Sequence, residues 1–387
     1  MRLRLPRISR SDALTILVFA VALVGLAAIR TDFAADPEPG SKERAEVLTV
    51  DNSDLREFGP LTAGSQMLTV RLLSGPLRGT EFRASNQLRA DMELDKIFAP
   101  GDRVLVAVVR DADPARTILF AQDHYRLHDT WMLFALFALL LVIFGGVVGV
   151  KALLSFGFCC LVVWRFVVPL CLKGHDPVWI AVAAVSILTA AVIFLAAGFN
   201  RKGVTAFAGA MLGVLCSAWM ADAFTSLFHI NGGVMPYARV LLFSGYETLE
   251  LPRLFVGAVI LAASGAVMDL GMDVAAGMQE VVEHHPAVSR VELTRSGLRI
   301  GRSVVGTMST TLLLAYSGGY LTLMMAFVAQ GVHPVDFINN PYVASEAVKT
   351  IIGSFGLVLV APFTALAGGF LLKKGGKNGN GDSGSGA

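Results

Sequence analysis

Apolar blocks long enough to cross a bilayer recur along this chain, and they constrain its fold more than any other feature. A helix needs about 20 apolar residues to span the hydrocarbon core of a membrane. Eight such blocks lie at residues 13–29, 130–150, 152–172, 177–198, 203–222, 253–276, 303–329 and 344–372. Only 16% of the 387 residues are charged, against about 25% in soluble domains. The sequence therefore predicts a membrane α-helical bundle of about eight transmembrane helices.

Lysine and arginine are distributed unevenly over the loops between these blocks. If the N-terminus is cytoplasmic, the short outer loops contain only Lys173, Arg239 and Arg253. The cytoplasmic pieces, which include Arg201 and Lys202, contain many more. Because positive charge accumulates on the cytoplasmic side, we expect a multi-pass protein of the bacterial plasma (inner) membrane with both termini inside.

The segments outside the bundle predict a four-part organisation. Residues 1–29 are a membrane anchor or a cleavable signal peptide. Residues 30–128 form an extracytoplasmic domain, and residues 129–372 form the bundle of seven helices that follows it. Residues 373–387 are rich in glycine, serine and asparagine, which is typical of a flexible cytoplasmic tail.

Residues 30–128 differ from the rest of the chain because they are polar and contain short β-branched segments. These segments lie at 45–50, 66–73, 79–84, 102–109 and 117–122, and turn residues separate them. This pattern predicts a small all-β domain, either an OB-like barrel or a β-sandwich. We find no catalytic constellation in it.

Composition and motifs exclude several classes of function. A formal net charge of +2 argues against a nucleic-acid partner. The chain contains no Walker A motif, no His-Glu-x-x-His motif and no serine nucleophile elbow, so we expect no enzymatic activity and no cofactor. The four cysteines lie in apolar blocks without metal-ligand spacing, which leaves a metal unknown: Cys159, Cys160, Cys171 and Cys216.

Asp269 and Asp273 lie four residues apart in the block 253–276, so one helix face carries both carboxylates. At ~1.5 Å per residue from Leu254, Asp269 lies about 22 Å along that helix and Asp273 about 28 Å. A charged acid at membrane depth costs about 2.5–3.5 kcal/mol. Two explanations stay open. The pair binds a cation or a proton, or it bonds to the arginines of the loop that follows: Arg290, Arg295, Arg299 and Arg302.

The block 303–329 contains further candidates for an ion or substrate site. Thr307 and Thr310 carry hydroxyls in its first half, where the alternative is a hydrogen bond to the preceding helical turn. Near mid-membrane come Tyr316, Ser317, Gly318 and Gly319. Such a sequence favours either a broken helix that lines a transport site or close helix packing through small residues.

Glu346 and Lys349 lie three residues apart at the outer start of the last block. On a helix this spacing brings the two side chains together. We expect a local ion pair there.

Four strings of residues identify a resemblance. "GAVMD", "GLRIGR", "GTMSTTLLLAYSGG" and "GSFGLVLVAPFTALAGG" resemble the YibE/F family of multi-pass membrane proteins, over about residues 65–372. The resemblance implies a membrane topology and no established activity. Asp269 matches the family pattern. Ser303 stands where the family tends to have an acid, Thr310 where it has asparagine, and Asp273 where it has a small residue.

We interpret the chain as a secondary transporter or an ion-coupled permease. The alternative is a non-enzymatic scaffold or partner-binding subunit that acts through the extracytoplasmic β-domain. The expected partners are the lipid bilayer, an ion or small solute, and a protein at the β-domain. A transporter predicts a polar cavity around Asp269 and residues 316–319, whereas a scaffold predicts a packed bundle and an exposed patch on the β-domain.

Overall fold

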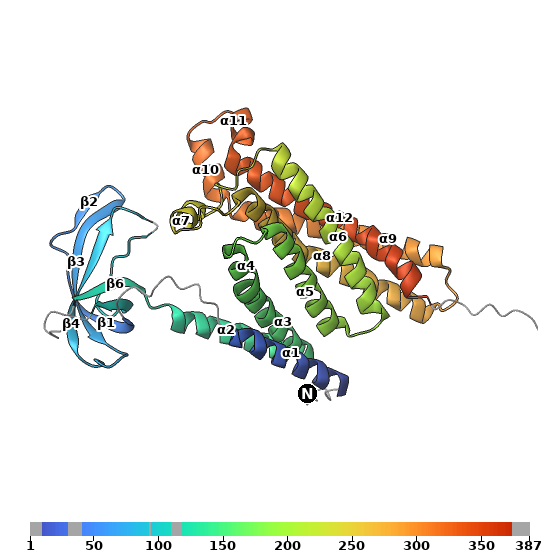
Figure 1. Cartoon of the computed structure of the whole chain (residues 1–387), viewed down its shortest axis with the longest axis horizontal. Coiled ribbons are helices and arrows are strands. Elements are labelled where there is room, and N and C mark those ends of the chain that lie inside the picture. Colours follow the sequence, from blue (N-terminus) through green and yellow to red (C-terminus); the bar gives the residue numbers. More distant parts are fainter. Residues whose placement is uncertain (1–9, 30–40, 93, 110–117, 374–387) are drawn as a thin grey trace, which may run out of the picture. The chain divides into compact units, whose positions relative to one another are not determined.

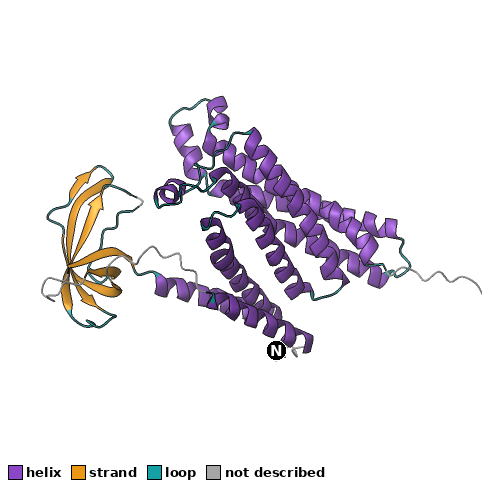
Figure 2. Cartoon of the chain, viewed as in Figure 1, coloured by secondary structure: helices purple, strands orange, loops and turns teal. Residues whose placement is uncertain are grey.

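A computed structural model describes residues 10–29, 41–92, 94–109 and 118–373. The chain divides into two compact units, one of residues 32–141 and one of residues 1–31 together with 142–387. Strands occupy the first unit and helices the second, and α2 continues from the first into the second (Figure 2). The predicted tail lies outside the described residues except for Lys373.

The strands form one closed sheet (Figure 1). They are β1 (Ser41–Asp51), β2 (Arg56–Phe58), β3 (Leu61–Leu72), β4 (Glu81–Arg89), β5 (Arg103–Val109) and β6 (Ile118–His124). Their order is β1-β5-β6-β4-β3-β2, and β1 also pairs with β3, which closes a ring. All pairings are antiparallel except β4 with β6. The predicted small β-barrel is confirmed, and each predicted segment overlaps a strand. Only β2 was missed.

The barrel interior follows from the alternation of side chains along each strand. Val104, Val106 and Val108 of β5 are buried, and the residues between them are not. One polar side chain, Gln66, is also completely buried. Its Oε1 accepts from the backbone N of Phe98 at 3.0 Å, and its Nε2 donates to the Phe98 carbonyl at 2.9 Å. These bonds satisfy the buried amide, as a buried polar group requires.

The helices are α1 (Arg10–Ala28), α2 (Leu127–Gly145), α3 (Val147–Val162), α4 (Val168–Leu172), α5 (Pro177–Ala197), α6 (Arg201–Leu227), α7 (Ala238–Phe243), α8 (Leu251–His284), α9 (Arg290–Gly318), α10 (Leu321–Ala329), α11 (Pro334–Asn339) and α12 (Pro341–Leu371). A five-residue π-helical turn, Val163–Val167, joins α3 to α4 without a break.

Among the described residues, six helical segments are long and apolar enough to cross a membrane: α2, α3–α4, α5, α6, α8 and α12. The bent pair α9–α10 gives a seventh if it counts as one span. The apolar part of α1, Ile16–Ala28, is shorter than a span requires. The multi-helix bundle is therefore present, while the full count of eight stays a prediction.

The bundle is organised around α6, α8 and α12, which pack against one another. α5 joins this core through α8, and the first half of α9 joins it through α12 (Figure 1). The buried residues are mostly valine, alanine and glycine. Small side chains let membrane helices approach closely, which compensates for the absence of a hydrophobic driving force in lipid.

Candidate functional site

Asp269 and Asp273 lie on the one face of α8 that the bundle leaves exposed. The neighbouring positions, such as Val267 and Leu270, are buried in the core. Within the described chain, neither aspartate forms an ion pair with any arginine that follows α8. The expectation that both acids lie inside the bundle is wrong. Their helix faces the core through its bulky apolar side, and the strip of small residues that carries the acids faces outward.

The packing of α9 on α8 places the threonines relative to these acids. Gly277 lies against Ile300, and Val274 lies beside Gly301, so the two helices run antiparallel. Counting back along α8 at ~1.5 Å per residue brings Asp269 level with Thr307. Both residues are exposed.

The threonine hydroxyls bond within their own helix. Thr307 Oγ1 donates to the Val304 carbonyl at 2.9 Å, and Thr310 Oγ1 donates to the Gly306 carbonyl at 3.0 Å. This is the local alternative that the sequence left open. Each hydroxyl oxygen keeps its capacity to accept a hydrogen bond or to coordinate a cation.

The spanning unit α9–α10 is broken at the predicted glycines. α9 ends at Gly318, α10 begins at Leu321, and the helix axes differ by 63°. A Cβ placed on Gly318 would meet nothing within 4 Å, so this glycine does not serve close helix packing. The Ser-Gly-Gly sequence therefore breaks the helix, and Figure 1 shows α10 turned away from α9.

A cavity of about 310 Å³ lies beside the break. It is lined by Leu313, Ser317, Tyr320, Leu323, Met324, Phe337, Val343, Glu346, Ala347, Thr350 and Ile351. Of the residues singled out in the sequence as site candidates, only Ser317 lines it. Tyr316, Gly318, Gly319 and Asp269 do not. The structure instead brings Tyr320 and Thr350 to this cavity together with Glu346.

Glu346 and Lys349 form the predicted ion pair, with Nζ 2.8 Å from Oε1. Their side chains are only 17% and 22% exposed. The other carboxylate oxygen, Oε2, is buried and has no hydrogen bond within the described part of the chain. The rings of Tyr316 and Tyr320 lie close enough to interact electrostatically with this carboxylate. A charged pair inside an apolar block was the signal in the sequence that marked this place.

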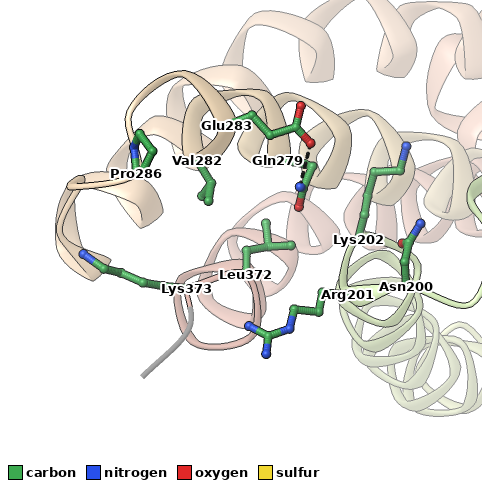
Figure 3. A pocket seen from close by; sticks show the side chains of 9 residues that line it. All are labelled: Asn200, Arg201, Lys202, Gln279, Val282, Glu283, Pro286, Leu372 and Lys373. Atoms are coloured by element: carbon green, nitrogen blue, oxygen red, sulfur yellow. Dashed lines mark hydrogen bonds between the residues drawn. The ribbon is translucent and has the colours of Figure 1, made fainter. Parts of the chain in front are cut away.

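A second cavity, of about 570 Å³, lies at the opposite end of α12 from Glu346 (Figure 3). It is lined by Asn200, Arg201, Lys202, Gln279, Val282, Glu283, Pro286, Leu372 and Lys373. These residues come from the start of α6, the end of α8 and the end of α12. Sequence reasoning assigned the basic residues among them only to membrane orientation.

The described residues contain no group of three or more His, Cys, Asp or Glu placed to hold a metal ion. All four cysteines are free thiols. The geometry therefore favours a cation or solute bound by a few oxygen groups, or a proton, over a transition-metal centre.

Comparison with known proteins gives one match. The sequence model of the family described as YibE/F-like protein matches residues 133–374, which is more than half of the chain and includes both cavities. No curated protein and no solved structure matches the chain.

Proposed function

This chain belongs to the YibE/F-like protein family, and we propose that it is a secondary transporter or ion-coupled permease of the bacterial plasma membrane. The observation that carries the proposal is the cavity at the α9–α10 break, where the Glu346 carboxylate has one paired and one unpaired oxygen. Broken helices at membrane depth are tolerated where they line a cavity, and in transporters they form the substrate and ion sites.

The size and lining of this cavity fit a small solute or a cation. At about 310 Å³ it lies at the lower end of the range for small-molecule sites, roughly 300–1,000 Å³. Its walls are mostly apolar, and Ser317, Tyr320 and Thr350 supply hydroxyls. Such a lining orients a ligand through a few polar groups and excludes water elsewhere.

The Glu346–Lys349 pair supplies the means of coupling. A cation or proton that binds Glu346 competes with the Lys349 ammonium for the same carboxylate, because two positive charges cannot share it without repulsion. Binding would then release Lys349 toward solvent. α10 contains no buried residue, so the segment beside this pair has few contacts to oppose its movement.

A transporter must open the cavity to each side of the membrane in turn, and this can be tested without a known substrate. Thr350→Cys would be introduced into a protein that lacks the native cysteines. An impermeant thiol reagent would be applied to intact cells and, separately, to inverted membrane vesicles. We expect labelling from both sides, and Glu346→Gln should change the ratio of the two rates.

Ser354→Cys is the matched control, because Ser354 lies one turn further along α12 and does not line the cavity. It should be labelled from neither side. Labelling of Thr350→Cys from one side only, or equal labelling of the two positions, would contradict alternating access and favour the scaffold function.

One observation supports that second candidate. The loop after β4 carries Met92, Leu94 and Ile97, which are 74%, 59% and 52% exposed. Exposed apolar side chains grouped on a loop are typical of a partner-binding surface. We infer an OB-like barrel from the closed ring of strands. Loss of an associated protein from Met92→Ser/Ile97→Ser in an affinity purification of the full chain would support this function.

A further inference from the structure

The cavity at the ends of α6, α8 and α12 collects basic side chains from segments far apart in the sequence. Arg201 and Lys202 begin α6, and Lys373 follows α12 (Figure 3). The cavity has one carboxylate, Glu283. Positive charge therefore predominates in a hollow of about 570 Å³, which is large enough for a phosphate-bearing headgroup.

The cations differ in how far the protein already uses them. Lys373 Nζ donates to the Val288 carbonyl, which fixes it beside the pocket. In the described part of the chain, Arg201 and Lys202 form no ion pair with a carboxylate. Glu283 Oε1 accepts from Gln279 Nε2 at 2.8 Å. Two basic side chains of the pocket thus remain available to an anion.

The backbone adds to the same field. Arg201 and Lys202 stand in the first turn of α6, where amide N–H groups have no acceptor within the helix and the helix dipole is positive. Asn200 caps this end, with its Oδ1 accepting from Gly203 N at 2.9 Å. The cap fixes the first turn and leaves the earlier amides near the pocket.

Apolar side chains lie immediately beside these charges. Phe199 precedes the pocket residue Asn200 and is 79% exposed, and Phe370 precedes Leu372 and is 68% exposed. A free phosphate ion would gain nothing from them. A phospholipid would gain from both parts, because its acyl chains could cover the exposed rings while its phosphate met the basic side chains.

We propose that this pocket binds the phosphate of an anionic phospholipid headgroup. It lies on the side that the distribution of lysine and arginine predicts to be cytoplasmic, where anionic lipids and basic pockets between helices meet. The positive-inside rule explains why these residues are basic. It does not explain why residues from three helices converge on one cavity.

The test measures binding of short-chain phosphatidylglycerol to the full-length protein in phosphatidylcholine nanodiscs. Arg201→Gln/Lys202→Gln should weaken binding about 30-fold, since each basic group near a membrane surface is worth about fivefold. Arg295→Gln/Arg299→Gln is the matched control. These exposed residues of α9 lie outside the pocket, and their loss should change affinity less than about twofold on the same estimate.

Two further arms separate the outcomes. Glu283→Gln removes the one acid and should strengthen binding about fivefold, a gain that does not depend on the double variant folding normally. Inorganic phosphate should compete only weakly, since it has no acyl chains. Equal losses in both double variants, no gain in Glu283→Gln, or full competition by phosphate would each overturn the proposal. None of these readouts depends on transport.

Discussion

In the contact between α6 and α12, glycines let two helix backbones approach, whereas at the α9–α10 break a glycine has open space around it. A Cβ on Gly209 would lie 2.7 Å from the Cα of Thr364, and one on Gly213 would lie 3.1 Å from Val360. A Cβ on Gly318 would meet nothing within 4 Å. The same residue type therefore fixes two helices together in one region and interrupts a helix in the other.

The two regions also differ in charge. The buried polar side chains of the helical unit, as far as it is described, are all serine or threonine. Beside the break, in contrast, Glu346 and Lys349 are mostly buried and charged. The difference indicates a rigid, neutral frame of α6, α8 and α12 next to a loosely packed segment that carries the ionisable groups. Substitutions should distinguish these regions by what they damage.

The largest effect should come from filling the α6–α12 contact. Gly209→Leu places a side chain where the Thr364 backbone lies, and overpacking of this kind costs typically 1–3 kcal/mol or more. We expect poor accumulation in the membrane, or a melting temperature lowered by more than for any other variant here. Gly318→Leu, in open space, should lower it little. Equal losses for the two would mean that the break is packed as tightly as the frame.

Breaking the charged pair should be the next largest change. Lys349→Met leaves the Glu346 carboxylate mostly buried without its cation. Removing one member of a buried pair costs about 3–5 kcal/mol, and the partial exposure reduces our expectation to about 2 kcal/mol.

The double variant Glu346→Gln/Lys349→Met should recover most of that loss, because no uncompensated charge remains. Thermal unfolding of the four proteins in detergent gives the coupling between the two sites. A single Lys349→Met variant as stable as the parent would show that the pair is not structural.

Much of the frame follows from the sequence, since hydrophobic length alone predicts where a helix can cross a bilayer. The break is also visible in it, because Ser317, Gly318 and Gly319 are poor helix formers in succession. The three-residue strand β2 was not predictable, as it carries no alternation of its own and exists only by pairing with β3.

The orientation of a helix within the bundle is harder to predict. α8 is apolar on several faces, so periodicity does not tell which face meets α6 and which stays outside. Asp269 and Asp273 therefore gave the right helix and the wrong environment. The cationic pocket was hidden for another reason: Arg201 and Lys373 are 172 positions apart by number, and only the packing of α6 against α12 brings them together.

A smaller effect is expected at the other end of the frame, where Asp176 bonds to Arg253. Arg253 Nε donates to Oδ1 at 3.0 Å, and a second guanidinium nitrogen meets Oδ2. Both side chains are about one third exposed, so Asp176→Asn should cost about 1 kcal/mol or less.

The hydrogen bond from Arg253 holds the pKa of Asp176 below its usual value, although burial opposes this. A lowered folded-state pKa means that the stabilisation is complete above the ordinary aspartate pKa of about 3.9 and is lost as pH falls below it. Melting temperatures of the parent and Asp176→Asn should therefore converge under acid conditions. A constant difference down to low pH would contradict this.

The smallest effect on stability should follow Asp269→Asn, although Asp269 is the acid that the sequence made most conspicuous. It is exposed on α8, and no cation pairs with it in the described part of the chain. Its replacement leaves no buried charge unpaired, so we expect a change within about 0.5 kcal/mol and normal abundance in the membrane. The thiol labelling of Thr350→Cys should also be unchanged, in contrast to its response to Glu346→Gln. If Asp269→Asn instead lowers the melting temperature strongly, a partner covers this face of α8. If it alters labelling at Thr350→Cys, the ionisable site extends from the break to α8, and the division between a neutral frame and a charged break fails.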